Sequence, residues 1–209
     1  MELLIFKNEP KKTPFAPEWF YPIAYGRLIG IDFNKIAQII LKKEKQIISS
    51  TSPVFDTGVT DGYTGLGSKS LTSRYNHFNV LLWKETEIQK LSKVILDFHS
   101  KYLKALNIRF DHELKIRCWA NVMRKNETIS PHCHSVNSDA YLSGHISVQC
   151  GKTATHYMTT ANHINDAPKR SIPNEVGQIT LFPTCMPHYT DTHKGKKERI
   201  TIAFDIYAA

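Results

Sequence analysis

The sequence lacks several features that would assign it quickly to a class of protein. Its 209 residues contain no apolar run near the roughly 18 residues that a membrane-spanning helix needs. The opening segment, MELLIFKNEPKK, has only a short apolar run before lysine and proline, so we expect a first β-strand there and not a signal peptide. The chain also has no internal repeat and no low-complexity linker, which favours a single domain.

Cysteine is scarce and irregularly placed. The four cysteines are Cys118, Cys133, Cys150 and Cys185. Their spacing does not form the C-x2-C pairs of zinc ribbons. Without an export signal, we expect them to be reduced thiols of a cytoplasmic protein, in the host cytoplasm if the protein is viral.

Acidic residues are fewer than basic ones, which gives a formal net charge of +8 and an isoelectric point near 9.3. The basic residues are spread along the chain, with local clusters at 42–45 and 194–199. This spread favours a solvated surface over a nucleic-acid footprint. The charge also suits a site for an anionic small molecule.

Helical periodicity predicts two helices in the first half. Asp32 can cap a helix that runs to about Ile48. A second helix is expected from about Glu85 to Leu106, because apolar residues recur there at every third or fourth position. His99 lies beside that apolar stripe and is interpreted as a core residue.

From Leu114 onward, the pattern changes to short apolar runs separated by turn residues. These runs cover residues 114–123, 142–149, 155–160, 177–183 and 198–207. Several short strands behind two amphipathic helices predict a β-sandwich or jelly roll, with the helices packed on the outside of a sheet.

Residues 60–76, between the two helices, form a Gly- and Ser-containing stretch. Lys69 comes one residue too late for the phosphate-binding pattern G-x4-G-K-[ST]. We therefore interpret the stretch as a mobile loop or lid beside a site.

Histidines are concentrated in the β-rich half. His132 and His134, in the stretch SPHCHS, are two residues apart, so on an extended strand both imidazoles can reach one metal ion. A hairpin-rich barrel would bring His188 beside this pair as a third ligand. Two or three protein ligands with positions left open are typical of non-haem Fe(II) oxygenases, although position 134 holds histidine where the H-x-D/E pattern has a carboxylate.

An arginine begins the last apolar strand. Arg199 would be costly on an inward face unless it met an anion, and its guanidinium is suited to gripping a carboxylate. Thr201 points to the same face and offers a hydroxyl. Metal ligands and a buried carboxylate clamp are what a bound 2-oxo acid needs. In the alternative interpretation, SPHCHS is a polar loop and Arg199 pairs with Glu198 or Asp205.

At these residues the sequence resembles the Fe(II)/2-oxoglutarate-dependent dioxygenase superfamily, whose core is a double-stranded β-helix, a cupin-like jelly roll. The nearest patterns are the aspartyl/asparaginyl β-hydroxylase-like branch and uncharacterised bacterial and phage oxygenases. The resemblance covers about residues 114–207, through WANVMRKNETISPHCH, LSGHISV, GQITLFPTCMPH and RITIAFDIY, in that order. It implies one oxygenase-like domain over 1–209, with helical support at about 32–106 and the β-helix core at about 112–207.

The resemblance also implies a role for each site residue. His132 and His188 would be the catalytic iron ligands, and Arg199 would bind the far carboxylate of 2-oxoglutarate. The residues expected to complete the cosubstrate site are Asn121, His145 and Thr201. His134 is expected either as a third metal ligand or as a hydrogen-bond donor beside the ligands. Asp205 matches a similarly placed acid with a structural role.

The expected function is that of an Fe(II)- and 2-oxoglutarate-dependent oxygenase. It would use O2 to hydroxylate a peptide, protein or small molecule and would release succinate and CO2. The positive charge permits a nucleic-acid substrate, and no membrane partner is expected. Two alternatives stay open: a metal-binding cupin-like protein that does not use 2-oxoglutarate, and a non-enzymatic viral or structural jelly roll.

Overall fold

The computed structural model describes residues 1–7, 13–15, 18–54, 64–134, 140–159 and 167–208. The elements of this described part are β1 (Glu2–Lys7), β2 (Phe20–Arg27), α1 (Phe33–Ser50), η1 (Thr72–Arg74), η2 (Val80–Leu82), α2 (Thr86–Ala105), β3 (Leu114–Met123), β4 (Ala140–Gln149), β5 (Ala154–Met158), β6 (Lys169–Pro173), β7 (Gln178–Pro183), β8 (His188–Thr190) and β9 (Arg199–Ala208).

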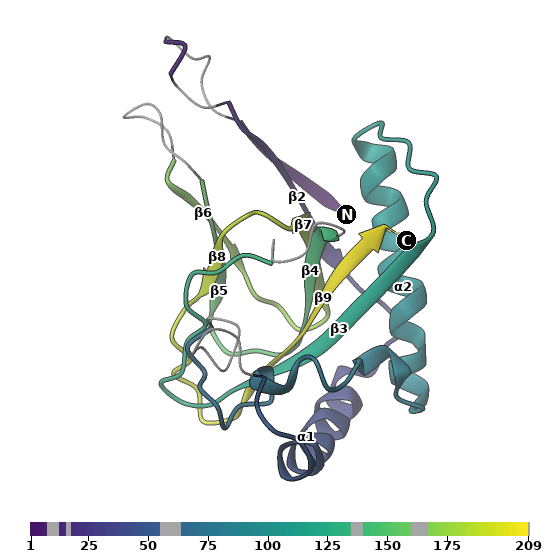
Figure 1. Cartoon of the computed structure of the whole chain (residues 1–209), viewed down its shortest axis with the longest axis vertical. Helices are drawn as coiled ribbons and strands as arrows, with labels where there is room; N and C mark the ends of the chain where they lie inside the picture. Colours follow the sequence, from purple (N-terminus) through teal and green to yellow (C-terminus); the bar gives the residue numbers. More distant parts are fainter. Residues whose placement is uncertain (8–12, 16–17, 55–63, 135–139, 160–166, 209) are drawn as a thin grey trace.

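The strands form two antiparallel sheets (Figure 1). The larger has the order β1-β2-β7-β4-β9-β3, and the smaller has the order β6-β5-β8. Apolar side chains of both sheets meet between them, including Ile23 and Phe182 from the larger sheet and Tyr157 and Ile172 from the smaller. This arrangement is the predicted jelly roll.

Both predicted helices are confirmed, and they lie on the outer side of the six-stranded sheet (Figure 1). The carboxylate of Asp32 caps α1 by accepting a hydrogen bond of 3.0 Å from the Lys35 amide. The apolar stripes of the two helices pack into one core with the sheet. His99 is a core residue as predicted, buried and hydrogen-bonded to the Tyr141 hydroxyl. Neither helix of the described residues is long and apolar enough to cross a membrane.

The five strands predicted in the second half are confirmed to within two residues at their described ends, and residue 160 lies outside the described residues. The first strand is also confirmed as β1. Three strands were not predicted. The sequence of β2, FYPIAYGR, contains a proline and a glycine, which disfavour a strand, and β8 has only three residues. β6, KRSIP, begins with two charged residues and ends in proline.

Candidate metal centre

Main-chain pairing places the three histidines of the predicted metal site. The segment 129–134 runs antiparallel to β8, and His132 lies opposite His188 in an isolated bridge. The His132 amide donates to the His188 carbonyl at 3.1 Å, and the His188 amide donates back at 2.8 Å. The His134 amide donates to the Thr184 carbonyl at 3.1 Å. The backbone, and not side-chain packing alone, therefore aligns these residues.

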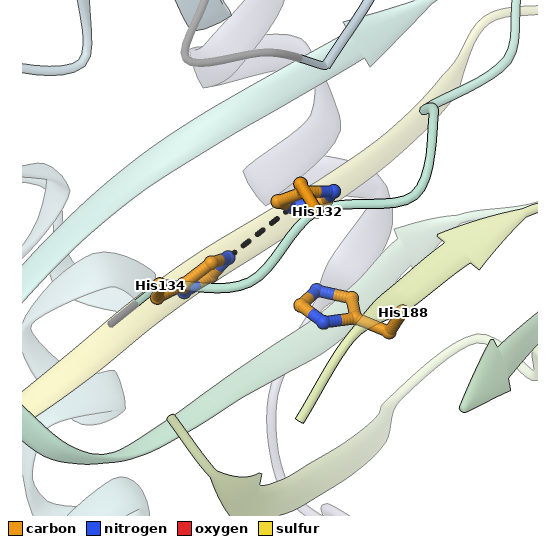
Figure 2. A group of neighbouring side chains, drawn as sticks. All are labelled: His132, His134 and His188. Atoms are coloured by element: carbon orange, nitrogen blue, oxygen red, sulfur yellow. Dashed lines mark hydrogen bonds between the residues drawn. The ribbon is translucent and has the colours of Figure 1, made fainter. Parts of the chain in front are cut away.

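The three imidazoles converge (Figure 2). One ring nitrogen from each of His132, His134 and His188 lies within 4.8 Å of the other two. Two of these atoms, Nε2 of His132 and Nε2 of His134, are 3.3 Å apart. Nitrogen ligands of one metal ion, each about 2.1 Å from it, are separated by a similar distance. The cluster therefore has the spacing of a metal site.

The hydrogen bonds of the other ring nitrogens fix the tautomer of each imidazole. Nδ1 of His132 donates to the Ser130 carbonyl at 2.8 Å, and Nδ1 of His188 donates to the Met186 carbonyl at 3.0 Å. A carbonyl oxygen can only accept a hydrogen bond, so the proton of each neutral ring is on Nδ1. Nε2 therefore carries a lone pair. This is how metal-binding histidines are commonly oriented.

His134 is held in the same way, by a carboxylate. Its Nδ1 lies 2.7 Å from Oδ1 of Asp205, which also accepts a hydrogen bond of 2.6 Å from the Ser143 hydroxyl. With both Nδ1 atoms protonated, Nε2 of His132 and Nε2 of His134 present lone pairs 3.3 Å apart, an arrangement that a shared metal ion would satisfy. The donor set therefore fits a divalent metal that accepts imidazole.

Burial keeps the innermost imidazole neutral. Burial, together with the neighbouring His132 and His134, holds the pKa of His188 well below its usual value. Metal binding needs a neutral imidazole, so His188 is ready to bind at neutral pH.

A cavity of about 150 Å³ adjoins the histidines, and Arg199 lines it. Arg199 is only 1% exposed, and burial lowers the pKa of its guanidinium to about 10. Its Nε donates to the Thr153 hydroxyl at 3.2 Å, and Nη1 lies 3.2 Å from the Met123 sulfur. No ion pair joins Arg199 to Glu198, Asp205 or any other acid in the described part of the chain. A buried cation without an acidic partner is a group that binds an anion.

The other predicted cosubstrate residues also line this cavity. Asn121, His145 and Thr201 are all buried there. The Asn121 side-chain oxygen accepts a hydrogen bond of 2.8 Å from the Thr72 hydroxyl. Burial, with Arg199 nearby, lowers the pKa of His145 to about 3, so this ring is neutral.

Two further residues lie beside the cluster. Cys133 is exposed and lines the cavity. Asp205, which the resemblance gave a structural role, holds the imidazole of His134. Of the predicted loop, residues 60–63 lie outside the described residues, while Thr64, Thr72 and Tyr75 do line the cavity.

The sequence interpretation missed the outer wall of the cavity. Four residues form it: Tyr75, Arg117, Trp119 and Tyr207. Arg117, Trp119 and Asn121 alternate along β3 and so face the same side. The period of two that singled out Thr201 beside Arg199 could have identified them, starting from Asn121.

Comparisons with known proteins give one family match and several structural likenesses. Residues 117–205 match the family model described as "Putative 2OG-Fe(II) oxygenase". No curated protein matches the chain significantly. The chain spans 60% of the length of a 2OG-Fe(II) oxygenase family oxidoreductase from Burkholderia pseudomallei, with 60% of this chain covered, 17% identity and a TM-score of 0.45.

Two solved structures share the fold over more of the chain. A prolyl-4-hydroxylase from Pseudomonas putida has a TM-score of 0.58 at 9% identity, covering 90% of this chain and 88% of its own. A prolyl hydroxylase from Trichoplax adhaerens, in complex with a hypoxia inducible factor peptide, has a TM-score of 0.52 at 10% identity, covering 89% and 83%. These likenesses show that the chain shares its overall fold with both hydroxylases.

Proposed function

We propose that this protein is a hydroxylase that uses ferrous iron and 2-oxoglutarate; the match of residues 117–205 to the 2OG-Fe(II) oxygenase family model supports the proposal. The observation that carries the proposal is the pairing of two features in one cavity. One ring nitrogen from each of three imidazoles converges beside it, and a buried arginine without an acidic partner among the described residues lines it. A 2-oxo acid needs both a metal and a cation for its far carboxylate.

His132, His134 and His188 would hold the iron through Nε2. With iron and 2-oxoglutarate bound, O2 would be the oxidant: one of its oxygen atoms would convert a substrate C–H bond to C–OH, and the other would enter the cosubstrate, which leaves as succinate and CO2. The chain itself supplies binding, orientation and exclusion of water. The histidines lie half-buried or buried beside the cavity, which limits their contact with bulk water.

Arg199 would bind the far carboxylate of 2-oxoglutarate, assisted by Asn121 and Thr201. Its guanidinium is already desolvated and positioned by Thr153, so little reorganisation is needed on binding. His145, held neutral by burial, would offer a ring N–H to the carboxylate nearer the metal and adds no charge of its own.

His134 would be a full ligand and not only a neighbouring donor. Its Nε2 shares the cluster with the other two rings, and its Nδ1 is occupied by Asp205. The negative charge that the H-x-D/E pattern places on the metal would here lie one imidazole further out, on Asp205. A carboxylate behind a ligating histidine orients it and raises its basicity.

The test is anaerobic addition of Fe(II) and then 2-oxoglutarate to the purified protein without a histidine tag. The expected result is the weak visible charge-transfer band of an iron–2-oxo acid complex, at one equivalent of each. His132→Ala should abolish the band. In Arg199→Met the band should appear only at a much higher concentration of 2-oxoglutarate. His77→Ala, at an exposed position outside the cavity, is the matched control.

Absence of the band, with no 2-oxoglutarate binding by calorimetry, would contradict the proposal. Metal binding that persists while Arg199→Met changes nothing would favour a cupin-like metal protein that does not use 2-oxoglutarate. For the substrate, peptides and small acids can be screened by succinate formation, since a prolyl-4-hydroxylase and a peptide-bound prolyl hydroxylase share the fold.

A further inference from the structure

Beyond the three histidines, the cavity continues to an outer wall that the proposed function does not use. This wall consists of Tyr75, Arg117, Trp119 and Tyr207. We propose that Arg117 is a specificity-determining residue that binds a carboxylate or phosphate of the substrate to be oxidised. The inference rests on the proposed function, because it assigns the substrate class of that same site.

The two arginines of the cavity lie toward opposite ends of one strand pair. Arg199 lies opposite Met123, and Arg117 lies opposite Asp205, in the antiparallel pairing of β3 with β9. At about 3.4 Å per residue, their backbone positions along this pair are roughly 20 Å apart. A five-carbon diacid bound at Arg199 therefore leaves Arg117 for a different ligand.

Charge leads to the same conclusion. The charged residues that line the cavity are Arg117, Arg199 and Asp205. The carboxylate of Asp205 already accepts hydrogen bonds from His134 and Ser143. When 2-oxoglutarate occupies the metal and Arg199, the cation at position 117 remains without a counter-charge, because no salt bridge of the described residues includes it.

The guanidinium of Arg117 is held in a way that leaves donors available. Its Cζ lies over the ring of Tyr75, 5.1 Å from the centroid, and it contacts the Tyr207 side chain. A guanidinium has five N–H donors, so contacts with one ring and one further side chain leave N–H groups for an oxyanion. Arg117 is half-buried, so water screens such a contact only partly.

Aromatic rings connect this cation to the metal centre. Trp119 lies 5.3 Å from the ring of His134 and 6.0 Å from that of Tyr75, between centroids. A substrate with its anion on Arg117 would therefore lay an apolar or flat portion against Trp119 and direct a C–H bond toward the histidines. Lys115 is exposed and lies on the same face of β3 as Arg117, two residues before it. Its positive charge would steer anions toward the cavity.

The experiment measures binding, not turnover. Protein loaded with Mn(II) and the unreactive analogue N-oxalylglycine is titrated calorimetrically with 3-phenylpropionate, phenyl phosphate and the neutral 3-phenylpropanamide. One of the two acids should bind at least about tenfold tighter than the amide, as expected for a charge-assisted hydrogen bond. Whichever acid binds tighter identifies the oxyanion as a carboxylate or a phosphate.

Arg117→Gln should remove the preference for the acid and leave the affinity for the amide unchanged, whereas Arg117→Lys should retain part of it. Arg27→Gln, at an exposed position of β2 outside the cavity, is the matched control and should behave as the wild type. Equal or absent binding of the acids and the amide to the wild type, or a preference that survives in Arg117→Gln, would overturn the inference.

The titration also separates this inference from the function on which it rests. Failure of the wild type to bind Mn(II) and N-oxalylglycine refutes the proposed function. If the wild type binds both normally, but the preference for the acid is the same in Arg117→Gln as in the wild type, only the assignment of substrate class is refuted.

Discussion

Replacing Arg199 with methionine is expected to leave the metal-free protein at least as stable as the wild type. The guanidinium is 1% exposed and is near Thr153 and Met123, without a carboxylate partner among the described residues. Burial lowers its pKa to about 10, so the folded protein disfavours the charged form by on the order of 3 kcal/mol. Methionine removes that penalty and fills similar space, as in other replacements of buried charges by apolar groups.

The same substitution should weaken 2-oxoglutarate binding severely. Removing one partner of a buried, hydrogen-bonded charge pair costs about 2–5 kcal/mol. This raises the Kd by roughly 30-fold to several thousand-fold. Calorimetric titration of the Mn(II)-loaded protein measures the Kd, and thermal unfolding of the metal-free protein measures stability.

The combination of outcomes is what tests the reasoning. A wild-type Kd in Arg199→Met would refute the role of Arg199 as the carboxylate clamp. A Tm lowered by more than about 5 °C would instead show that the guanidinium stabilises the fold. Arg170→Met, at an exposed position outside the cavity, controls for the loss of one positive charge.

Three further predictions concern the histidine cluster and the fold. Asp205→Asn should lower metal affinity by about 10- to 100-fold, because it weakens the support of His134; unchanged affinity in a competition titration would contradict this. The pKa of His145 is about 3 in the folded protein and near 6.5 when unfolded, so its contribution to stability is complete above pH 6.5 and declines as the pH falls. Urea unfolding of the metal-free protein should show a loss of about 2 kcal/mol from this group at pH 5, absent in His145→Gln. Gly144→Ala would place a Cβ 2.3 Å from the Phe204 ring and 2.5 Å from a backbone carbonyl, so we expect a loss of about 1–3 kcal/mol or more; an unchanged urea midpoint would disprove the clash.

The sequence pattern was sufficient to predict the helices and strands whose apolar residues recur at a regular spacing. The cap at Asp32 and the apolar stripe of α2 depend on neighbours within one or two turns, and both appear as predicted. The ten residues of β3 were located correctly because an apolar run bounded by turn residues is a local property. β8 has three residues and is defined by its partner β5, so no local signal exists for it.

In the candidate site, too, contacts between residues close in the sequence were predictable and contacts between distant residues were not. The i, i+2 spacing of His132 and His134 is visible in the sequence, and their side chains do converge. The contact of Asp205 with His134 joins residues 71 positions apart, and only the pairing of β9 within the sheet brings them together. The outer wall was missed for another reason: Arg117 and Trp119 look like ordinary strand residues until the direction of the cavity is known.

The structure of the protein with Mn(II) and 2-oxoglutarate would test the central claim most directly. We predict one Mn(II) bound by Nε2 of His132, His134 and His188, with Asp205 still on Nδ1 of His134 and the far carboxylate of 2-oxoglutarate on Arg199. A metal bound without His188, or a cosubstrate carboxylate that lies away from Arg199, would contradict the account.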